Sequence, residues 1–120
     1  MTVLSRSLQL LTRDTVLVRY ITDGQSIPWR VRPGTSQVEQ VTDSALVNVA
    51  RLQDFVGPLP IGRHGPIEPG PGDRVEWDRN GQTDIFEVLP AVGEDYFAPV
   101  DAYGQLYRVH TKLTGFDLGD

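Results

Sequence analysis

Apolar and polar residues alternate most regularly between positions 74 and 89. Val75 and Trp77 alternate with charged residues before Asn80-Gly81, and the alternation resumes around Phe86. This period of two predicts a β-hairpin, because asparagine and glycine tolerate the positive φ angles of a tight turn. Two registers fit the pattern: a two-residue turn places Val75 opposite Phe86, whereas a four-residue loop places Trp77 opposite Phe86. Both registers turn the same apolar face inward, and that face needs a cover.

The same pattern recurs elsewhere in short runs that are separated by turn signals. Asp23-Gly24 and Pro33-Gly34 are expected to interrupt strands, and Pro28 indicates a sheet edge or a strand start because proline lacks a backbone donor. Short strands with a turn signal every eight to twelve residues or so predict an all-β fold, an antiparallel barrel or sandwich, here a small antiparallel β-barrel of SH3 or OB size. The predicted strands outside the hairpin cover residues 15–22, 27–32, 37–41, 45–49 and 106–113.

The N-terminal residues 4–12 follow a different period. Leu4, Leu8 and Leu11 recur at helical spacing, which predicts a short helix with one apolar stripe. Because so short a helix is marginal in isolation, it must dock either on its own barrel or on a neighbouring subunit. We therefore assign residues 1–14 to a helical segment of a single domain that spans residues 1–120.

Two long loops separate the predicted strands. Ten of the sixteen residues 57–72 are glycine or proline, and such a connection is usually a functional or a disordered loop. The second loop covers residues 90–103. The tail 114–120 is expected to be mobile except where Phe116 or Leu118 finds a pocket. Three apolar residues of the first loop have no periodic partner, so they anchor it either on its own barrel or on another chain: Leu59, Ile61 and Ile67.

Composition limits the class of protein. With 120 residues, of which 39% are hydrophobic, the chain suits one domain with a single core. The sequence has no cysteine, which excludes disulfides and thiolate chemistry. No apolar run approaches the roughly 20 residues that span a bilayer. The N-terminus lacks the features of a secretory leader, so we expect nothing to direct the chain out of the cell.

Charge is distributed unevenly along the chain. Residues 1–60 carry six Arg against five acids, a net of +1, and residues 61–120 carry four Arg and one Lys against eleven acids, a net of −6. An acidic half repels phosphate, so nonspecific binding to duplex DNA is disfavoured. Such a surface still suits a passage through which DNA moves without being held.

No residue pattern indicates an enzyme, a cofactor or a bound metal. His64 and His110 lie 46 residues apart, and a metal site would need both of them with a carboxylate such as Asp101. The glycine-rich loop lacks the Lys-Ser/Thr pair of a phosphate-binding loop. Arg74 and Glu87 are expected to form a surface pair across the hairpin. Most of the acids in this half are expected on a solvated face: Asp73, Glu76, Asp78, Asp84, Glu87, Glu94, Asp95 and Asp101.

A barrel that binds single-stranded nucleic acid is the alternative from another functional class. Trp29 is followed by Arg30 and Arg32, and Tyr107 is followed by Arg108. Aromatic side chains beside basic ones are the platforms on which unpaired bases stack. The acidic composition counts against this alternative.

Five short segments, taken in chain order, form a further pattern. They are Val18-Arg19-Tyr20 after the predicted helix, Gln53-Asp54-Phe55-Val56, Pro71-Gly72-Asp73-Arg74-Val75, Phe86-Glu87-Val88-Leu89, and Leu106-Tyr107-Arg108-Val109-His110-Thr111-Lys112. Together they resemble the small structural proteins that join heads to tails in tailed bacteriophages and prophages. The chain departs from that family in the glycine and proline content of residues 57–72 and in the lack of a tryptophan in residues 94–103.

The resemblance implies a head-closure, or stopper, protein of the phage neck, with a tail-completion (tail-terminator) protein as the nearest alternative. Such a protein is made in the host cytoplasm and forms a homo-oligomeric ring in the virion. The ring contacts a portal or adaptor protein on the head side and a tail protein on the other. Packaged DNA passes through it without sequence-specific binding, and no membrane is involved. The two long loops would meet neighbouring subunits or rings through these residues: Leu59, Ile61, Arg63, His64, Ile67, Tyr96 and Phe97.

Overall fold

The computed structural model describes residues 14–41, 47–89 and 96–118. The predicted N-terminal helix, residues 4–12, lies outside these ranges. Within them, no helix is long and apolar enough to cross a membrane. The described elements are all strands: β1 (Val16–Thr22), β2 (Gln25–Val41), β3 (Val47–Gly57), β4 (Ile61–Gly62), β5 (Gly65–Pro66), β6 (Arg74–Arg79), β7 (Gln82–Val88), β8 (Phe97–Pro99) and β9 (Tyr107–Leu118).

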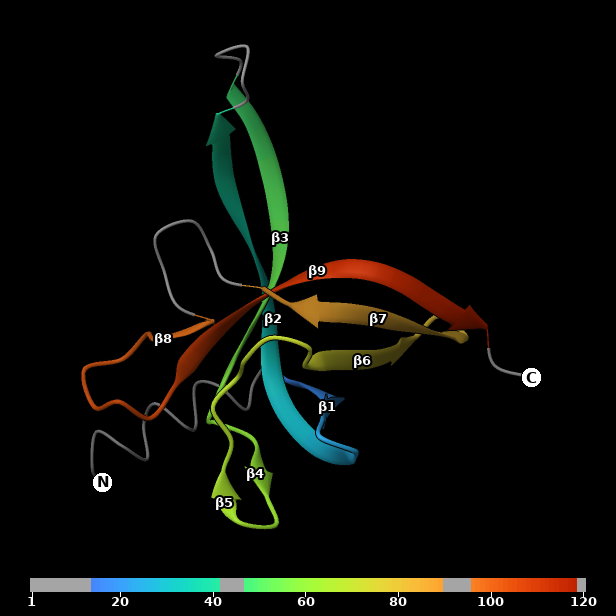
Figure 1. Ribbon diagram of the computed structural model, residues 1–120, viewed down its shortest axis with the longest axis vertical. Coiled ribbons are helices and arrows are strands. Elements are labelled where there is room, and N and C mark those ends of the chain that lie inside the picture. The colour runs from blue at the N-terminus through green and yellow to red at the C-terminus, as the bar shows by residue number, and fades with distance from the viewer. Residues whose placement is uncertain (1–13, 42–46, 90–95, 119–120) are drawn as a thin grey trace.

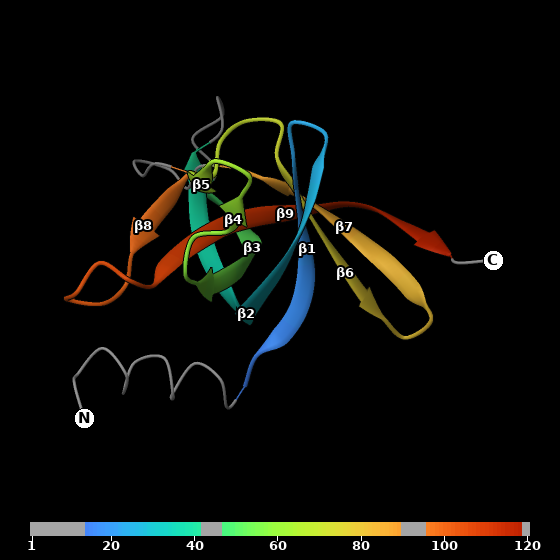
Figure 2. The same cartoon turned by 90° about the horizontal axis from the view of Figure 1, so that it is seen from below.

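Six antiparallel strands close into a barrel, which confirms the predicted all-β fold (Figures 1 and 2). The strand order is β3-β2-β1-β6-β7-β9, and a direct pairing of β3 with β9 completes the circle. Closure leaves few unpaired edges, which is how small barrels avoid uncontrolled association. Strand β8 adds to β9 outside the circle, and β4 and β5 form a separate two-stranded ribbon.

The hairpin between β6 and β7 has the two-residue turn, with Val75 opposite Phe86. Asn80 and Gly81 both adopt positive φ, 54° and 77°. Such a turn matches the right-handed twist of the flanking strands. Asp23-Gly24 forms the same kind of turn between β1 and β2, with φ values of 47° and 74°. Local turn chemistry therefore sets both registers.

Pro33-Gly34 does not interrupt a strand, contrary to the prediction. β2 runs continuously through this dipeptide, but its partner changes from β1 to β3 between Val31 and Arg32. Gly34 pairs with Asp54 in extended conformation and needs no positive φ. The dipeptide thus lies where the strand passes from one side of the barrel to the other. Pro28 lies on the part of β2 that pairs only with β1, as expected of a sheet edge.

A long two-stranded projection, which we call the arm, consists of residues 37–41 and 47–51. Short strands were predicted at residues 37–41 and 45–49. Residues 37–41 are the distal end of the longer β2, residues 47–51 belong to β3, and the two ends pair with each other up to Val41 and Val47. Figure 1 shows the arm extending away from the barrel along the longest molecular axis. The radius of gyration is 15.3 Å, whereas a compact chain of this length has about 14 Å.

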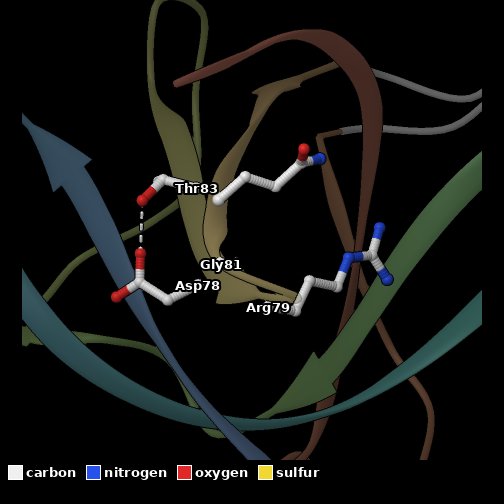
Figure 3. Close-up of a pocket in the computed structure, with 5 residues that line it drawn as sticks. Asp78, Arg79, Gly81 and Thr83 are labelled. Carbon is white, nitrogen blue, oxygen red and sulfur yellow. Dashed lines mark hydrogen bonds between the residues drawn. The ribbon is translucent and has the colours of Figure 1, made fainter. Parts of the chain in front are cut away.

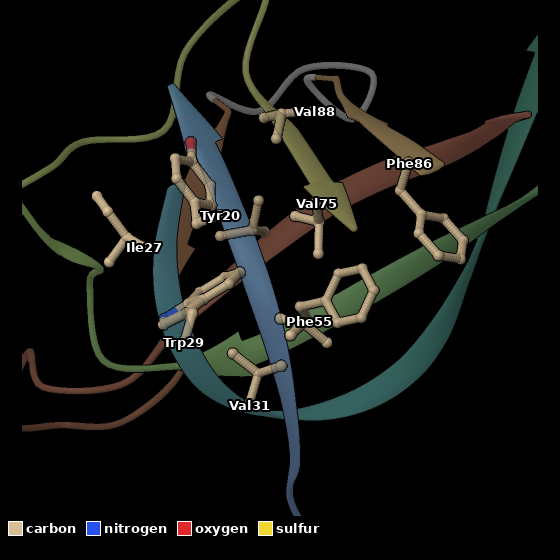
Figure 4. Packing of buried hydrophobic residues seen from close by; sticks show 10 residues of the cluster. Tyr20, Ile27, Trp29, Val31, Phe55, Val75, Phe86 and Val88 are labelled. Carbon is tan, nitrogen blue, oxygen red and sulfur yellow. The ribbon is translucent and has the colours of Figure 1, made fainter. Parts of the chain in front are cut away.

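The core lies inside the barrel and is rich in aromatic residues (Figure 4). The rings of Trp29 and Phe55 lie 6.4 Å apart, and Phe55 contacts Phe86 edge to face at 5.4 Å. Tyr20 meets Trp29 in the same edge-to-face geometry at 5.4 Å. Aromatic contacts of this kind contribute about 0.5–1.5 kcal/mol each beyond area burial. The remaining members are aliphatic: Val18, Ile27, Val31, Val75, Val88 and Val109.

The last strand is longer than predicted. β9 was expected to end at residue 113 and to be followed by a mobile tail, but it continues to Leu118 and pairs with β7 throughout. Phe116 and Leu118 do not occupy pockets, because their exposed fractions are 61% and 64%. The second predicted loop also contains a strand, since β8 pairs with β9 within residues 97–99.

Candidate functional site: assembly surfaces of the barrel

The base of loop 57–72 is fixed on its own barrel. The Trp29 indole Nε1 donates to the Pro58 carbonyl at 2.6 Å, and the Ile67 amide donates to the Pro60 carbonyl at 2.8 Å. Ile67 packs against the core cluster, and Leu59 is half-buried. One of the predicted interface residues, Ile67, therefore anchors the loop, and the loop carries structure despite its composition.

The tip of this loop, residues 61–66, points away from the barrel as the β4–β5 ribbon (Figures 1 and 2). Ile61 is 63% exposed, and Arg63 and His64 are exposed beside it. The Arg63 amide donates to the Gln25 side chain at 3.3 Å, which holds the tip near the β1–β2 turn. An open groove between the tip and that turn is lined by Gln25, Ile27, Pro28, Ile61 and Arg63, with Gly24, Ser26 and Gly62. Ile61 and the positively charged Arg63 thus face solvent from a loop tip that is held by contacts with the barrel.

Tyr96 and Phe97, the other predicted interface residues, contact their own barrel. Both are half-buried and pack against the core cluster. Phe97 lies opposite Val109 in the β8–β9 ladder, and its ring meets that of Tyr107 at 5.6 Å. The structure therefore does not present this pair as a protruding aromatic tip.

Asp73 supports the end of loop 57–72 from inside. Its carboxylate accepts the Tyr20 hydroxyl at 2.5 Å, the Thr22 hydroxyl at 2.6 Å and the Gly70 amide at 3.1 Å. Burial, and then the hydrogen bond to Asp73, raise the pKa of Tyr20 far above its usual range. Asp73 was expected on a solvated face, but it is only 8% exposed. A buried carboxylate requires such donors. Asp73 therefore connects the end of the loop to β1 through hydrogen bonds to Gly70 on one side and to Tyr20 and Thr22 on the other.

A second buried carboxylate, Asp54, lies at the root of the arm. Its side chain accepts from Ser36, contacts His110 Nδ1 at 2.8 Å, and forms an ion pair with Arg108 at 3.5 Å. These residues join β2, β3 and β9 where the arm leaves the barrel. In the sequence, Asp54 belongs to the family-like segment Gln53-Asp54-Phe55-Val56, which indicates no particular role for it. The sole signal was a charged residue directly before the apolar Phe55 in a strand-like run.

Charged groups gather at the turn between β6 and β7, where a shallow pocket opens (Figure 3). Arg79 donates to Asp84 at 2.6 Å and lies 4.0 Å from the centre of the Trp77 ring. The hydrogen bond from Arg79 lowers the pKa of Asp84. Hydrogen bonds from Arg19 and Thr83 lower the pKa of the exposed Asp78 to about 2. These charged groups contact one another within the sheet, and only residues of the turn and its flanking strands line the pocket. We therefore assign no binding role to it.

The residues weighed for catalysis or metal binding do not come together. His64 is exposed at the loop tip, and His110 is buried beside Asp54. Asp101 accepts the backbone amides of Gln105 and Leu106 at 2.9 and 3.2 Å. Among the residues that the structure describes, no group of three His, Cys, Asp or Glu side chains is placed to hold a metal ion.

Trp29, the main stacking platform of the nucleic-acid alternative, is buried. Only 3% of its surface is exposed, and its indole nitrogen is engaged with the loop backbone. A base cannot stack on a ring that lies inside the core. The structure therefore contradicts single-strand binding through Trp29.

The fold defines the class of protein first: a small, closed, antiparallel β-barrel from which an arm and a loop tip project. Comparison with known families identifies it further. The family model described as phage head-tail joining protein matches residues 2–117, so the chain belongs to this family and the resemblance seen in the sequence is confirmed. No curated protein and no solved structure is significantly similar to the chain. Membership implies a structural protein of the phage neck that interacts with head and tail components.

Proposed function

We propose that the protein is the stopper of the phage neck, a ring of identical subunits that closes the head after DNA packaging and receives the tail. Family membership over residues 2–117 is the observation that carries this proposal. The closed barrel supports it, because a rigid body with supported projections offers distinct surfaces to different neighbours. The net charge of −5 supports it as well, since an acidic protein repels DNA that passes through a ring.

Within this proposal, the loop tip contacts a neighbouring molecule in the neck. Ile61 is exposed on a loop whose base is fixed by Pro58, Pro60 and Ile67, so little conformational entropy is lost when a partner binds. Arg63 beside it provides a charge that can pair with an acidic neighbour. The remainder of the loop holds the tip in position.

The experiment that tests the stopper function is a phage in which this gene is interrupted. We expect full-length tails that remain unattached and heads that fail to retain their packaged DNA, as electron microscopy and nuclease protection of the lysate would show. Tails of irregular length beside stable, DNA-filled heads would contradict the stopper function and would indicate tail completion instead.

A narrower variant tests the loop tip. Replacing Ile61, Arg63 and His64 together by serine should leave the barrel folded, because all three side chains are exposed. The contact should weaken by at least about tenfold, the effect of about 1.4 kcal/mol of lost contact energy, and the yield of infectious particles should fall. The matched control is Leu17→Ser, which also removes an exposed apolar side chain (57%) but lies on β1, outside both long loops. Normal infectivity of the triple variant would remove the tip from the assembly contacts.

A further inference from the structure

The C-terminal half of β9 carries three large apolar side chains that face solvent. Leu113, Phe116 and Leu118 are 51%, 61% and 64% exposed. Leu113 lies opposite Phe86, and Phe116 lies opposite Asp84. Residues directly opposite in adjacent strands share one face of a sheet. Because Phe86 and Asp84 are buried on the inner face, the three apolar side chains project from that same face, beyond the part that the barrel covers.

A β-bulge aligns these side chains. Leu113 and Phe116 are three positions apart in the sequence. In a regular strand, residues an odd number of positions apart lie on opposite faces. The pairing register shifts between Ile85 and Phe86, and the hydroxyl of Thr114 donates to the Ile85 carbonyl at 3.2 Å. One extra residue in β9 brings Phe116 and Leu118 onto the face of Leu113. Bulges commonly redirect side chains toward functional surfaces.

No described strand covers this part of β9. β3 pairs with β9 only as far as Thr111, and Figure 1 shows the arm and the end of β9 diverging from that point. Residues 113–118 therefore present both an apolar face and an unpaired edge. Apolar sheet edges left open in a single chain are interaction or aggregation sites. We call this surface the β9 patch: Leu113, Phe116 and Leu118.

We propose, on the basis of the assembly role above, that the N-terminal segment of a second copy covers the β9 patch. Residues 1–13 lie outside the described structure, and their Leu4, Leu8 and Leu11 form an apolar stripe if the segment is helical. As a helix, the segment would be about 20 Å long, and residues 113–118 extend over about 17 Å along the strand. If the segment is helical, the chain therefore contains two apolar surfaces of similar length that each need a cover.

Charge favours the same encounter. The segment contains Arg6 and Arg13 and no acid, whereas residues 113–118 contain one acid, the exposed Asp117, and no base. Oppositely charged surfaces increase the rate at which two copies meet. The contact joins the N-terminal surface of one subunit to a different surface, near the C-terminus, of the next. A contact of this heterologous type generates a ring when its rotation closes.

Cysteine cross-linking tests the contact directly, because the natural sequence contains no cysteine. Leu8→Cys and Leu118→Cys variants are purified separately as full-length chains, mixed, and treated with a short bifunctional maleimide. We expect a cross-linked pair that contains one copy of each variant. The matched control replaces Leu118→Cys by Leu17→Cys, which places a thiol at another exposed leucine (57%) and should give at least fivefold less product. Equal yields from both mixtures would overturn the proposal.

The double variant Leu8→Cys/Leu118→Cys shows whether the patch is covered by the N-terminal segment of a second copy or by that of the same chain. Cross-links between molecules that disappear on dilution support the second-copy contact. An internal cross-link that forms independently of concentration would show that each segment covers its own barrel, which overturns it.

A substitution in the patch separates this contact from the proposed function. Phe116→Ser/Leu118→Ser should keep the melting temperature of the monomer, because both side chains are exposed, but should abolish ring formation in sedimentation velocity. If this variant forms rings as the natural protein does, the contact is wrong while the stopper function stands. If the cross-links form but interrupting the gene leaves heads closed and tails attached, the stopper function is wrong while the contact stands.

Discussion

Asp54 illustrates how one buried carboxylate can connect three strands. It is 2% exposed, and its donors come from β2 (Ser36) and β9 (Arg108), with His110 of β9 at 2.8 Å. A carboxylate at this depth is tolerated only because its oxygens are engaged. Its position at the root of the arm means that the same contacts that close the barrel also fix the direction in which the arm leaves it.

Replacing Asp54 by alanine should lower the free energy of unfolding by about 2–3 kcal/mol. The substitution removes the carboxylate that accepts from Ser36 and contacts the buried His110, and hydrogen bonds to a charged group contribute about 1.5–3 kcal/mol. Urea denaturation measures the difference. The control, Glu87→Ala, removes an exposed acid from β7 and should change stability by less than about 0.5 kcal/mol. Similar losses for both variants would show that the Asp54 contacts are not stabilising.

Acid should destabilise the protein partly through Asp84. Arg79 lowers the pKa of this carboxyl in the folded state below its ordinary value of 3.8. The folded protein therefore binds fewer protons than the unfolded chain, so the stabilisation is complete above pH 3.8 and is lost as the pH falls through the folded-state pKa. In denaturation measured between pH 7 and pH 2.5, Asp84→Asn should be less stable than the natural protein at pH 7 and should lose less stability on acidification. Parallel pH profiles would contradict this role.

The two tight turns show the same physics at the scale of the element. Gly81 has a φ of +77° at the β6–β7 turn, a conformation that disfavours any residue with a Cβ. Gly81→Ala should therefore cost about 1 kcal/mol in the free energy of unfolding. Gly34→Ala is the matched control, because Gly34 lies in β2 without positive φ and with open space around the added Cβ. The prediction fails if both alanine variants unfold at the same denaturant concentration.

Elements governed by local chemistry were predictable from the sequence. The hairpin around Asn80-Gly81 followed from its alternation and turn residues, although its register remained open because both alternatives turned the same face inward. The prediction that Pro33-Gly34 interrupts a strand was wrong because the outcome depends on long-range pairing and not on local chemistry. Whether proline and glycine end a strand depends on which neighbours the strand has, and β2 changes neighbours there. The length of β9 was missed because its C-terminal half is held by pairing with β7 rather than by a buried face.

The candidate site was predictable only in part, because burial is a long-range property. The glycine- and proline-rich composition of residues 57–72 indicated a loop with a role, and its tip does carry exposed Ile61 and Arg63. Sequence alone could not show that Ile67 packs on the core while Ile61, six residues earlier, faces solvent. The pairing of Asp54 with His110 spans 56 residues of sequence and leaves no local pattern.

At the scale of the whole molecule, three projections leave one rigid barrel: the arm, the loop tip and the end of β9. The polar contacts of Asp54 and Asp73 lie at the bases of the arm and the loop, respectively. Buried hydrogen bonds at such positions hold a projection in one orientation relative to the core. The proposed ring requires defined angles between its contacts, and rigid bases would let a subunit of 120 residues contact several neighbours at those angles.

The arm is the projection whose length the barrel itself does not explain. An isolated two-stranded hairpin is at best marginally stable in water, so we expect the arm to be completed by contact with another molecule. Replacing residues 37–51 by Asn-Gly joins Ser36 to Leu52, which already pair, and keeps the Ser36–Asp54 hydrogen bond. Because the replacement keeps the β2–β3 pairs from Arg32 to Ser36, melting should change by less than about 4 °C, the shift that roughly 1 kcal/mol produces in a domain of this size.

The shortened chain should have a smaller radius of gyration in solution scattering, and phages that carry it should yield unjoined heads and tails. The control replaces only residues 42–46 by Asn-Gly, which connects the paired Val41 and Val47 and preserves the length of the arm. Because that variant keeps every arm pairing described here, its particles should remain infectious. If the shortened chain supports joining as well as the control does, the arm makes no contact that assembly requires. The required contacts would then be made by the loop tip and the end of β9.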